Sequence, residues 1–201
     1  MALHHRFALI PLLAAGLGLA ACDASNADGS ARVRVLLTDA PFPFDLADSA
    51  NVTIERVELV TRDSARIVLS DSVFWFNLLD LRDGVTAELA DSVLLGGTYA
   101  QLRFIVGDSA SVVFHDGRVF PLRVPSGTQT GIKVNLPPIE VENPGETVVI
   151  TADFDVERSF NAQGPPDNPT GFHFRPVLHL DSLIVNGQPV PREEFPEGDG
   201  E

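Results

Sequence analysis

The sequence predicts an all-β domain, an antiparallel β-sandwich with at most one short helix. Three observations support this prediction. Short segments between residues 32 and 190 alternate apolar and polar side chains with a period of two. Turn-forming Gly, Asn, Asp and Pro residues separate these segments. The series of strands and long helices that a parallel α/β fold needs is missing, so we expect a sandwich of immunoglobulin-like or prealbumin-like form.

The first two strand segments show the alternation well. The segment "RVRVLL" (32–37) places three apolar side chains, Val33, Val35 and Leu37, on one face. The segment "NVTIERVELV" (51–60) has apolar residues in one phase before Glu55-Arg56 and in the other phase after it. Such a change of phase predicts a β-bulge within one long strand.

The remaining segments continue the strand pattern. Asp116-Gly117 predicts a hairpin, with positive φ angles that suit a tight primed turn. Residues 80–95 are the one segment expected to hold a short helix. Further strands are predicted in "ARIVL", "VFWFNL", "YAQLRFIV", "GIKVNL", "TVVITADFDVERSF" and "GFHFRPVLHLDSLIV".

The N-terminal residues resemble a bacterial lipoprotein signal. Residues 1–21 contain a basic start with Arg6, an apolar core and small residues before Cys22. The apolar core is about 14 residues, shorter than the roughly 18 to 20 that span a bilayer. "LAAC" resembles the lipobox, in which the cysteine is lipidated and cleavage precedes it. Cys22 is the chain's one cysteine, so we expect it to carry the lipid; the alternative is a cysteine that merely follows a cleaved signal.

The expected organisation has four parts: a signal peptide (1–21), a lipidated cysteine with a flexible tether (22–31), a sandwich domain (32–190) and a disordered acidic tail (191–201). Cleavage would remove Arg6 from 14 basic residues and leave 13 against 28 acidic ones, a net charge of −15. Such a chain is repelled by nucleic acid. We therefore expect a membrane contact through the lipid and no nucleic-acid partner.

Five separated segments resemble the domain-of-unknown-function 4382 family of envelope lipoproteins. The resemblance extends over residues 32–180 and implies a secreted or lipid-anchored all-β domain. It implies no catalytic residue. The segments are "LLTDAP" (36–41), "GGTYAQLR" (96–103), "VPSGTQTGIK" (124–133), "ADFDVERS" (152–159) and "FHFRPVL" (172–178).

The segment "TADFDVE" (151–157) is the strongest candidate site. Alternation on a strand would place Asp153, Asp155 and Glu157 together on the face opposite the core. Asp39, at the end of the first strand, would add a ligand if that strand is a neighbour. Asp39, Asp153 and Asp155 are thus a candidate Ca²⁺ site. The alternative is a solvated acidic face with an Asp in a turn, which is favoured because no EF-hand spacing is present.

Two other residues have a functional and a structural interpretation. Ser126 lies between Pro and Gly but lacks the Gly-x-Ser-x-Gly elbow of a nucleophile, so a tight loop is the favoured interpretation. Trp75, in the apolar run "VFWFNLL", is expected to pack in the core; a platform for carbohydrate stacking is the alternative.

These observations predict a non-enzymatic, membrane-anchored envelope lipoprotein that binds or scaffolds an unidentified envelope protein or glycan. No cofactor is expected, apart from Ca²⁺ in the candidate acidic site. The alternatives are a calcium-stabilised adhesion or glycan-binding module, and a hydrolase that uses Ser126 or the acidic strand. The predicted location is the cell envelope.

Overall fold

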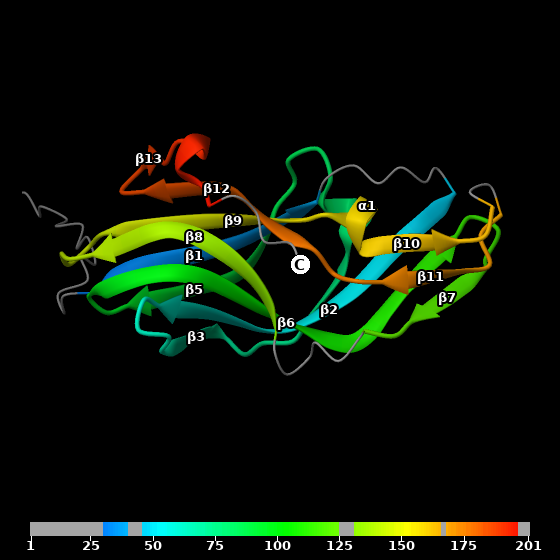
Figure 1. The fold of residues 1–201 in the computed structure, drawn as a ribbon, viewed down its shortest axis with the longest axis horizontal. Coiled ribbons are helices and arrows are strands. Elements are labelled where there is room, and N and C mark those ends of the chain that lie inside the picture. The colour runs from blue at the N-terminus through cyan, green and yellow to red at the C-terminus, as the bar shows by residue number, and fades with distance from the viewer. Residues whose placement is uncertain (1–29, 40–45, 125–130, 166–167, 197–201) are drawn as a thin grey trace, which may run out of the picture.

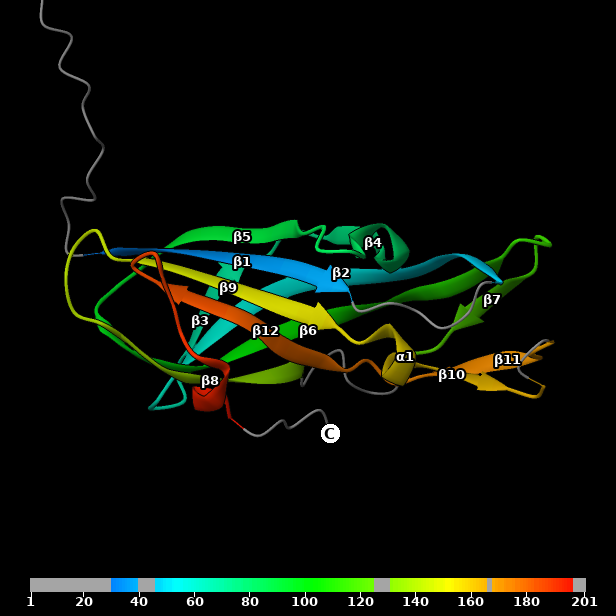
Figure 2. The same ribbon diagram turned by 90° about the horizontal axis from the view of Figure 1, so that it is seen from above.

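Two β-sheets pack face to face in the computed structural model, which describes residues 30–39, 46–124, 131–165 and 168–196 (Figure 1). The predicted β-sandwich is therefore confirmed. The molecule is elongated, and β1 begins at one end of its long axis (Figure 2). The described residues contain no helix with the length and apolar character that crossing a membrane requires. Cys22 lies outside the described residues.

The first sheet has five strands in the order β13-β12-β9-β1-β5. Its interior strand β1 pairs antiparallel with the edge strand β5 but parallel with β9. The prediction of a purely antiparallel sandwich misses this one pair, because strand direction depends on the connections and not on local alternation. The strands are β1 (Ala31–Asp39), β5 (Ala87–Leu94), β9 (Thr147–Phe154), β12 (Leu178–Val185) and β13 (Gln188–Pro189).

The second sheet is built around its two longest strands, β2 and β6, which pair with each other. At one end of this pair, β3 pairs with β2 and β8 pairs with β6. At the other end, β4 pairs with β2 and β7 pairs with β6. The strands are β2 (Ala47–Thr61), β3 (Arg66–Ser70), β4 (Phe74–Asn77), β6 (Gly97–Phe114), β7 (Val119–Leu122) and β8 (Ile132–Val141). The predicted bulge at Glu55-Arg56 is confirmed, since the β2–β6 register shifts between Ile54 and Arg56.

The helical segments are short, and the α-helix is not where we expected it. Within residues 80–95 the structure has the end of the 3-10 helix η1 (Leu78–Leu81) and then the strand β5. The α-helix α1 (Val156–Ser159) instead follows β9, and it leads into the pair β10 (Phe160–Gln163) and β11 (Gly171–Phe174). Together with β7, this pair lies at the end of the long axis opposite the start of β1 (Figures 1 and 2).

The core lies between the two sheets and confirms the predicted strand faces. Val33, Val35 and Leu37 are fully buried, and so are the alternate residues of β9. The core extends to the β10–β11 pair, where Phe174 stacks on Phe154 with ring centroids 6.4 Å apart. Fully buried residues from both sheets include Ile54, Leu59, Leu102, Phe104, Ile150, Ala152 and Phe154.

The turn at Asp116-Gly117 differs from the primed turn that we expected. Gly117 has φ of 83°, but Asp116 is not among the positive-φ residues. Gly117 N–H donates to Phe114 C=O, and Phe114 N–H donates to Arg118 C=O. The hairpin therefore has a three-residue loop with a glycine bulge.

The chain remains structured beyond the expected domain end at residue 190. Pro191 precedes the 3-10 helix η2 (Arg192–Glu194), and Phe195 is partly buried against the core. Arg192 pairs with Asp181 of β12 at 2.8 Å. Part of the segment that we expected to be a disordered tail thus covers the sandwich beside β12.

Candidate functional site

Asp39 is a carboxylic acid at a core position. It continues the inward-facing series of Val33, Val35 and Leu37 at the end of β1, and it lies opposite Phe154 of β9. It is only 4% exposed. Strand alternation thus takes its side chain to the inner face of the sheet.

The surroundings of Asp39 favour its protonated form. Burial raises its pKa from an ordinary value of 3.8 to about 8, and the nearby carboxylate of Asp153 adds to this effect. The Arg82 guanidinium and the Val156 backbone N–H lower the pKa in part. Within the described residues, neither carboxylate oxygen has a hydrogen bond of standard geometry. A proton is therefore the simplest way for the protein to neutralise this side chain.

Asp153 lies on the other face of the same sheet. It pairs in register with Thr38 on one side and with His179 on the other. Its neighbours along β9, Ala152 and Phe154, are fully buried in the core, so alternation directs Asp153 outward. Asp39 and Asp153 thus belong to opposite faces.

Asp155 does not continue the strand, contrary to our expectation. β9 ends at Phe154, and the Asp155 side chain caps α1 by accepting a 2.8 Å hydrogen bond from Arg158 N–H. Asp155 Oδ2 also lies 3.3 Å from His179 Nε2. The prediction that Asp155 and Glu157 share a strand face with Asp153 is therefore wrong, because a helix cap interrupts the alternation.

These positions bear on the candidate calcium site. Asp39, Asp153 and Asp155 come close enough for their charges to interact, as the sequence suggested. Among the residues that the structure describes, however, no three His, Cys, Asp or Glu side chains form a group that could hold a metal ion. Ser126, the candidate nucleophile, lies outside the described residues.

Trp75 is on the surface, so the prediction that it packs in the core is wrong. It is 63% exposed, whereas its neighbours Phe74 and Phe76 pack against the core. β4 lies at an edge of the second sheet, where only one face meets the core, and alternation turns Trp75 outward. An unbroken apolar run cannot show from sequence which of its members face outward.

A hollow of about 330 Å³, here called the Trp75 hollow, lies beside this indole on the outer face of the second sheet. Asn51 of β2 and Ser111 of β6 are directly paired at its floor, and Pro121 of β7 is paired with Ser111. It is lined by Asn51, Trp75, Asp108, Ser109, Ala110, Ser111, Pro121 and Leu122.

A bulge in β6 shapes this hollow. Val52 is paired with Ala110 and Ile54 with Val106, so three residues of β2 span the same length as five residues of β6. The extra residues include Asp108 and Ser109, and bulges of this kind re-aim side chains. Asn51, Asp108 and Ser111 belong to no sequence motif that would predict a site. Gly107 within the strand pattern was a signal for the bulge.

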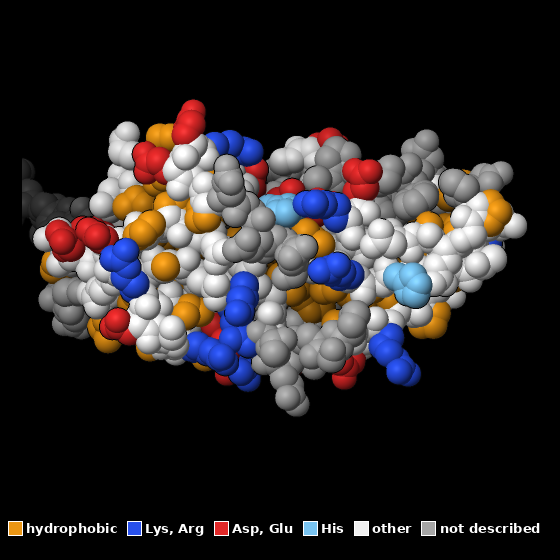
Figure 3. Space-filling view, in the orientation of Figure 1, with side chains coloured by type: hydrophobic (Ala, Val, Ile, Leu, Met, Phe, Trp, Pro, Cys, Tyr) orange, Lys and Arg blue, Asp and Glu red, His pale blue; other side chains and the backbone are white. Residues whose placement is uncertain are grey.

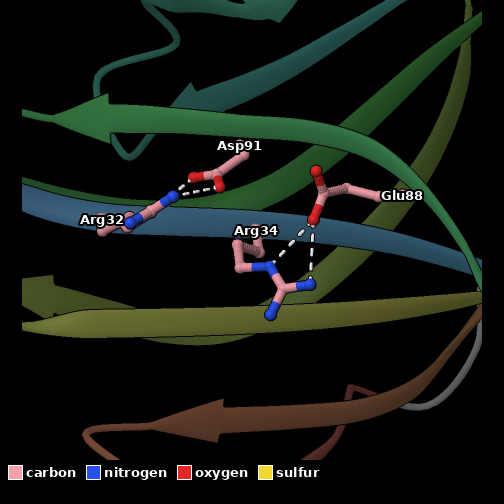
Figure 4. Close-up of polar contacts among 4 residues, drawn as sticks. All are labelled: Arg32, Arg34, Glu88 and Asp91. Carbon is pink, nitrogen blue, oxygen red and sulfur yellow. Dashed lines mark hydrogen bonds and ion pairs between the residues drawn. The ribbon is translucent and has the colours of Figure 1, made fainter.

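Some charged side chains elsewhere on the surface form ion pairs across neighbouring strands. Arg32 and Arg34 on the outer face of β1 bind Asp91 and Glu88 of β5 (Figure 4). The Arg32 Nε to Asp91 Oδ1 distance is 2.7 Å, and the Arg34 Nη2 to Glu88 Oε2 distance is 2.9 Å. On the face shown in Figure 3, acidic side chains occur in separate places with Lys and Arg between them. The net charge of −14 therefore forms no continuous acidic surface on that face.

Comparison with known proteins gives a family but no characterised relative. The model of a family described as Domain of unknown function (DUF4382) matches residues 30–176. No curated protein and no solved structure shows significant similarity to the chain. The matched range contains Trp75, Asn51 and Asp108, as well as Asp39 and the end of β9. Because the match covers well over half of the chain, the protein belongs to the DUF4382 family.

Proposed function

We propose that the protein is a non-enzymatic, lipid-anchored binding module of the bacterial cell envelope. The observation that carries this proposal is the position of the chain start relative to the Trp75 hollow. β1 begins at one end of the long axis, whereas β4 and β7, which contribute Trp75 and Pro121, lie toward the other end (Figure 2). A lipid on Cys22 would hold the first end near the bilayer and leave the hollow accessible.

The anchor rests on the residues around Cys22. "LAAC" ends a short apolar segment, and only eight residues separate Cys22 from the first strand at Ala31. A single acyl chain binds a membrane only marginally, at about 0.8 kcal/mol per buried methylene, so stable anchoring requires two or three chains. The lipobox supplies such a modification at one cysteine.

A binding role is supported by how the described acidic groups are used. Asp155 caps α1, and Asp39 is enclosed by the core, so Asp155 has a structural role and Asp39 is shielded from a ligand at the surface. Trp75, in contrast, is exposed and has no structural role of that kind. Large exposed aromatic side chains beside polar groups are typical of recognition surfaces.

The anchor is tested by replacing its cysteine in the full chain. We expect the unmodified protein to enter the detergent phase in a phase-separation assay and Cys22→Ser to remain in the aqueous phase. Mass spectrometry of the unmodified protein should show acyl groups on an N-terminal Cys22. Ser25→Ala, three residues further on, is the matched control and should behave as the unmodified protein. Detection of the unmodified protein in the aqueous phase, without acyl groups, would contradict the anchor.

A further inference from the structure

The indole of Trp75 is exposed on a sheet that otherwise buries its aromatic side chains. It is the chain's only tryptophan, and 63% of it is exposed. Phe74 and Phe76, on either side of it, stack with centroids 5.9 Å apart on the core side. β4 thus gains its core contacts from the two Phe residues. The outward indole provides a flat apolar face at the edge of the Trp75 hollow.

The floor of the hollow contains a buried amide that the protein satisfies only in part. Asn51 is 6% exposed, and its Nδ2 donates to Ser49 Oγ at 3.0 Å and to Ser111 Oγ at 3.2 Å. Asn51 Oδ1 receives no hydrogen bond from the part of the chain that the structure describes. A buried acceptor without a donor lowers the stability of a fold, so such groups call for an explanation. A donor bound in the hollow would provide one.

The hydrogen bond from Asn51 also leaves the hydroxyl hydrogen of Ser111 to be donated to another group. Because Ser111 Oγ accepts from Asn51, its own hydrogen is left to point elsewhere, and accepting one hydrogen bond strengthens a hydroxyl as a donor. The carboxylate of Asp108 can only accept when ionised. The hollow therefore presents both hydrogen-bond donors and hydrogen-bond acceptors. A ligand group that both donates and accepts, such as a hydroxyl, can be satisfied there.

The charges of the hollow indicate which ligands fit. Among the residues that the structure describes, its lining contains one acidic residue, Asp108, and no Lys or Arg. Phosphate and carboxylate ligands are recognised by Arg, Lys or clustered backbone N–H groups, and Asp108 would repel them. The ligand class that combines apolar C–H faces with many neutral hydroxyl groups is carbohydrate.

We propose that the Trp75 hollow is a binding site for neutral carbohydrate. One face of a sugar ring stacks on the indole, while hydroxyl groups bind Asp108, Ser109 and Ser111 and approach the Asn51 amide. β4 and β7 are separated by two strands, so the site spans roughly 14 Å across the sheet. It therefore takes an oligosaccharide better than a monosaccharide. This inference rests on the proposed binding function and names its ligand class.

The single tryptophan allows a direct test. The full chain, in a detergent without a sugar headgroup, is titrated with cellotetraose, maltotetraose, mannotetraose and chitotetraose while Trp75 fluorescence is recorded. We expect a saturable change in emission with at least one tetrasaccharide, at lower concentration than with its monosaccharide. Asp108→Ala keeps the reporter and should weaken that binding by roughly tenfold. Absence of a saturable response to all four tetrasaccharides would overturn the proposal.

Calorimetry with the responding sugar tests the location. Trp75→Ala should abolish measurable binding, and Leu95→Ala should not change it, since Leu95 is 72% exposed and lies outside the hollow. Unchanged binding by Trp75→Ala, or a response to a proline-rich peptide and to no sugar, would also overturn the proposal. If the unmodified protein enters the detergent phase but binds no sugar, the carbohydrate site alone is contradicted. If the unmodified protein stays in the aqueous phase, the lipid anchor is contradicted instead.

Discussion

Asp39 occupies an inward-facing position of β1, where the preceding inward-facing residues are all apolar. Its backbone follows Val33, Val35 and Leu37, and the core encloses it as it does them. The cost of burying the charge is reflected in its pKa of about 8, against an ordinary 3.8. The side chain is therefore mostly protonated at neutral pH in the folded protein and ionised in the unfolded one.

Stability should consequently fall as pH rises. The folded state holds a proton on Asp39 that the unfolded state releases above about pH 4. The stability that this proton contributes is therefore complete below about pH 4 and is lost by about pH 8. Asp39→Asn resembles the protonated form and should remove this slope. At pH 8 to 9 we expect the free energy of unfolding of Asp39→Asn to exceed that of the unmodified protein by at least about 1 kcal/mol, which corresponds to a few degrees in Tm.

Thermal melting at several pH values checks this prediction. Asp71→Asn, at an exposed position, is the matched control and should keep the slope. An unchanged slope in Asp39→Asn would show that another group is responsible. Adding millimolar calcium at pH 8 distinguishes an Asp39 that is neutralised by a proton from one that is neutralised by a metal ion. A rise in Tm that is lost in both Asp39→Asn and Asp153→Asn would show that the cluster holds the metal.

Glu58 and Arg103 form a buried ion pair between β2 and β6. They are directly paired in register, and Arg103 Nε lies 3.8 Å from Glu58 Oε2. Both side chains are at most 7% exposed. Glu58 Oε1 also lies 3.6 Å from Nη1 of the half-exposed Arg56. Breaking a buried ion pair by removing one partner costs about 3 to 5 kcal/mol, and we expect the lower end of this range where Arg56 remains, whereas apolar replacement of both buried partners is often close to neutral.

The corresponding prediction uses a double-variant cycle. Arg103→Met should lower the free energy of unfolding in urea by about 3 kcal/mol, and Glu58→Leu with Arg103→Met should restore most of it. Equal losses in the single and the double variant would mean that packing of the Arg103 side chain, rather than charge, is what matters.

At the scale of elements, alternation identified the strands well but not their ends or partners. It located the bulge at Glu55-Arg56 and the buried face of β9. It failed at Asp155, where a side-chain cap ends β9, and at Trp75, where an edge position exposes one face. The two failures have different origins. The cap is a local contact of Asp155 with Arg158, three residues further on, whereas the position of Trp75 depends on the pairing of β4 with β2. Alternation along a strand describes neither of them.

The C-terminal segment is an element that composition alone could not reveal. Its acidic and proline-rich composition predicted disorder, yet Phe195 is partly buried against the core. One apolar side chain and the ion pair of Arg192 with Asp181 are enough to hold a short segment in place.

Removing this segment should therefore lower stability slightly. Deletion of residues 191–201 exposes the surface that Phe195 covers, and we expect a loss of roughly 1 to 2 kcal/mol in urea unfolding. Phe195→Ala should reproduce most of the loss. Deletion of residues 197–201 removes none of these contacts and is the control. If both deletions give the same result, the contact of Phe195 does not stabilise the fold.

At the scale of the whole molecule, one core connects all three sheets. Buried residues run from Ala31 to Leu183 in sequence, and Phe160 and Phe174 join the β10–β11 pair to the sandwich. Within the described residues, no part of the fold has a core of its own. The domain should thus unfold as one unit.

This predicts that residues 30–196 fold without the first 29. Calorimetry should give a single transition with a Tm equal to that of the full chain, since every core residue that the structure describes lies in this range. The van't Hoff and calorimetric enthalpies should agree. Two transitions would show that the β10–β11 end unfolds separately.

The interior position of β1, between two partner strands, determines how the domain would respond to mechanical force. A pull from an anchored N-terminus, resisted by a ligand held in the Trp75 hollow, would act along β1, which lies along the molecular long axis (Figure 2). β1 is bonded to β9 on one side and β5 on the other, so the load would shear both ladders at once. Many hydrogen bonds must then break together, whereas an edge strand pulled sideways would unzip one bond at a time. The same topology that pairs the first strand on both sides thus makes it an attachment that resists a pull along its axis.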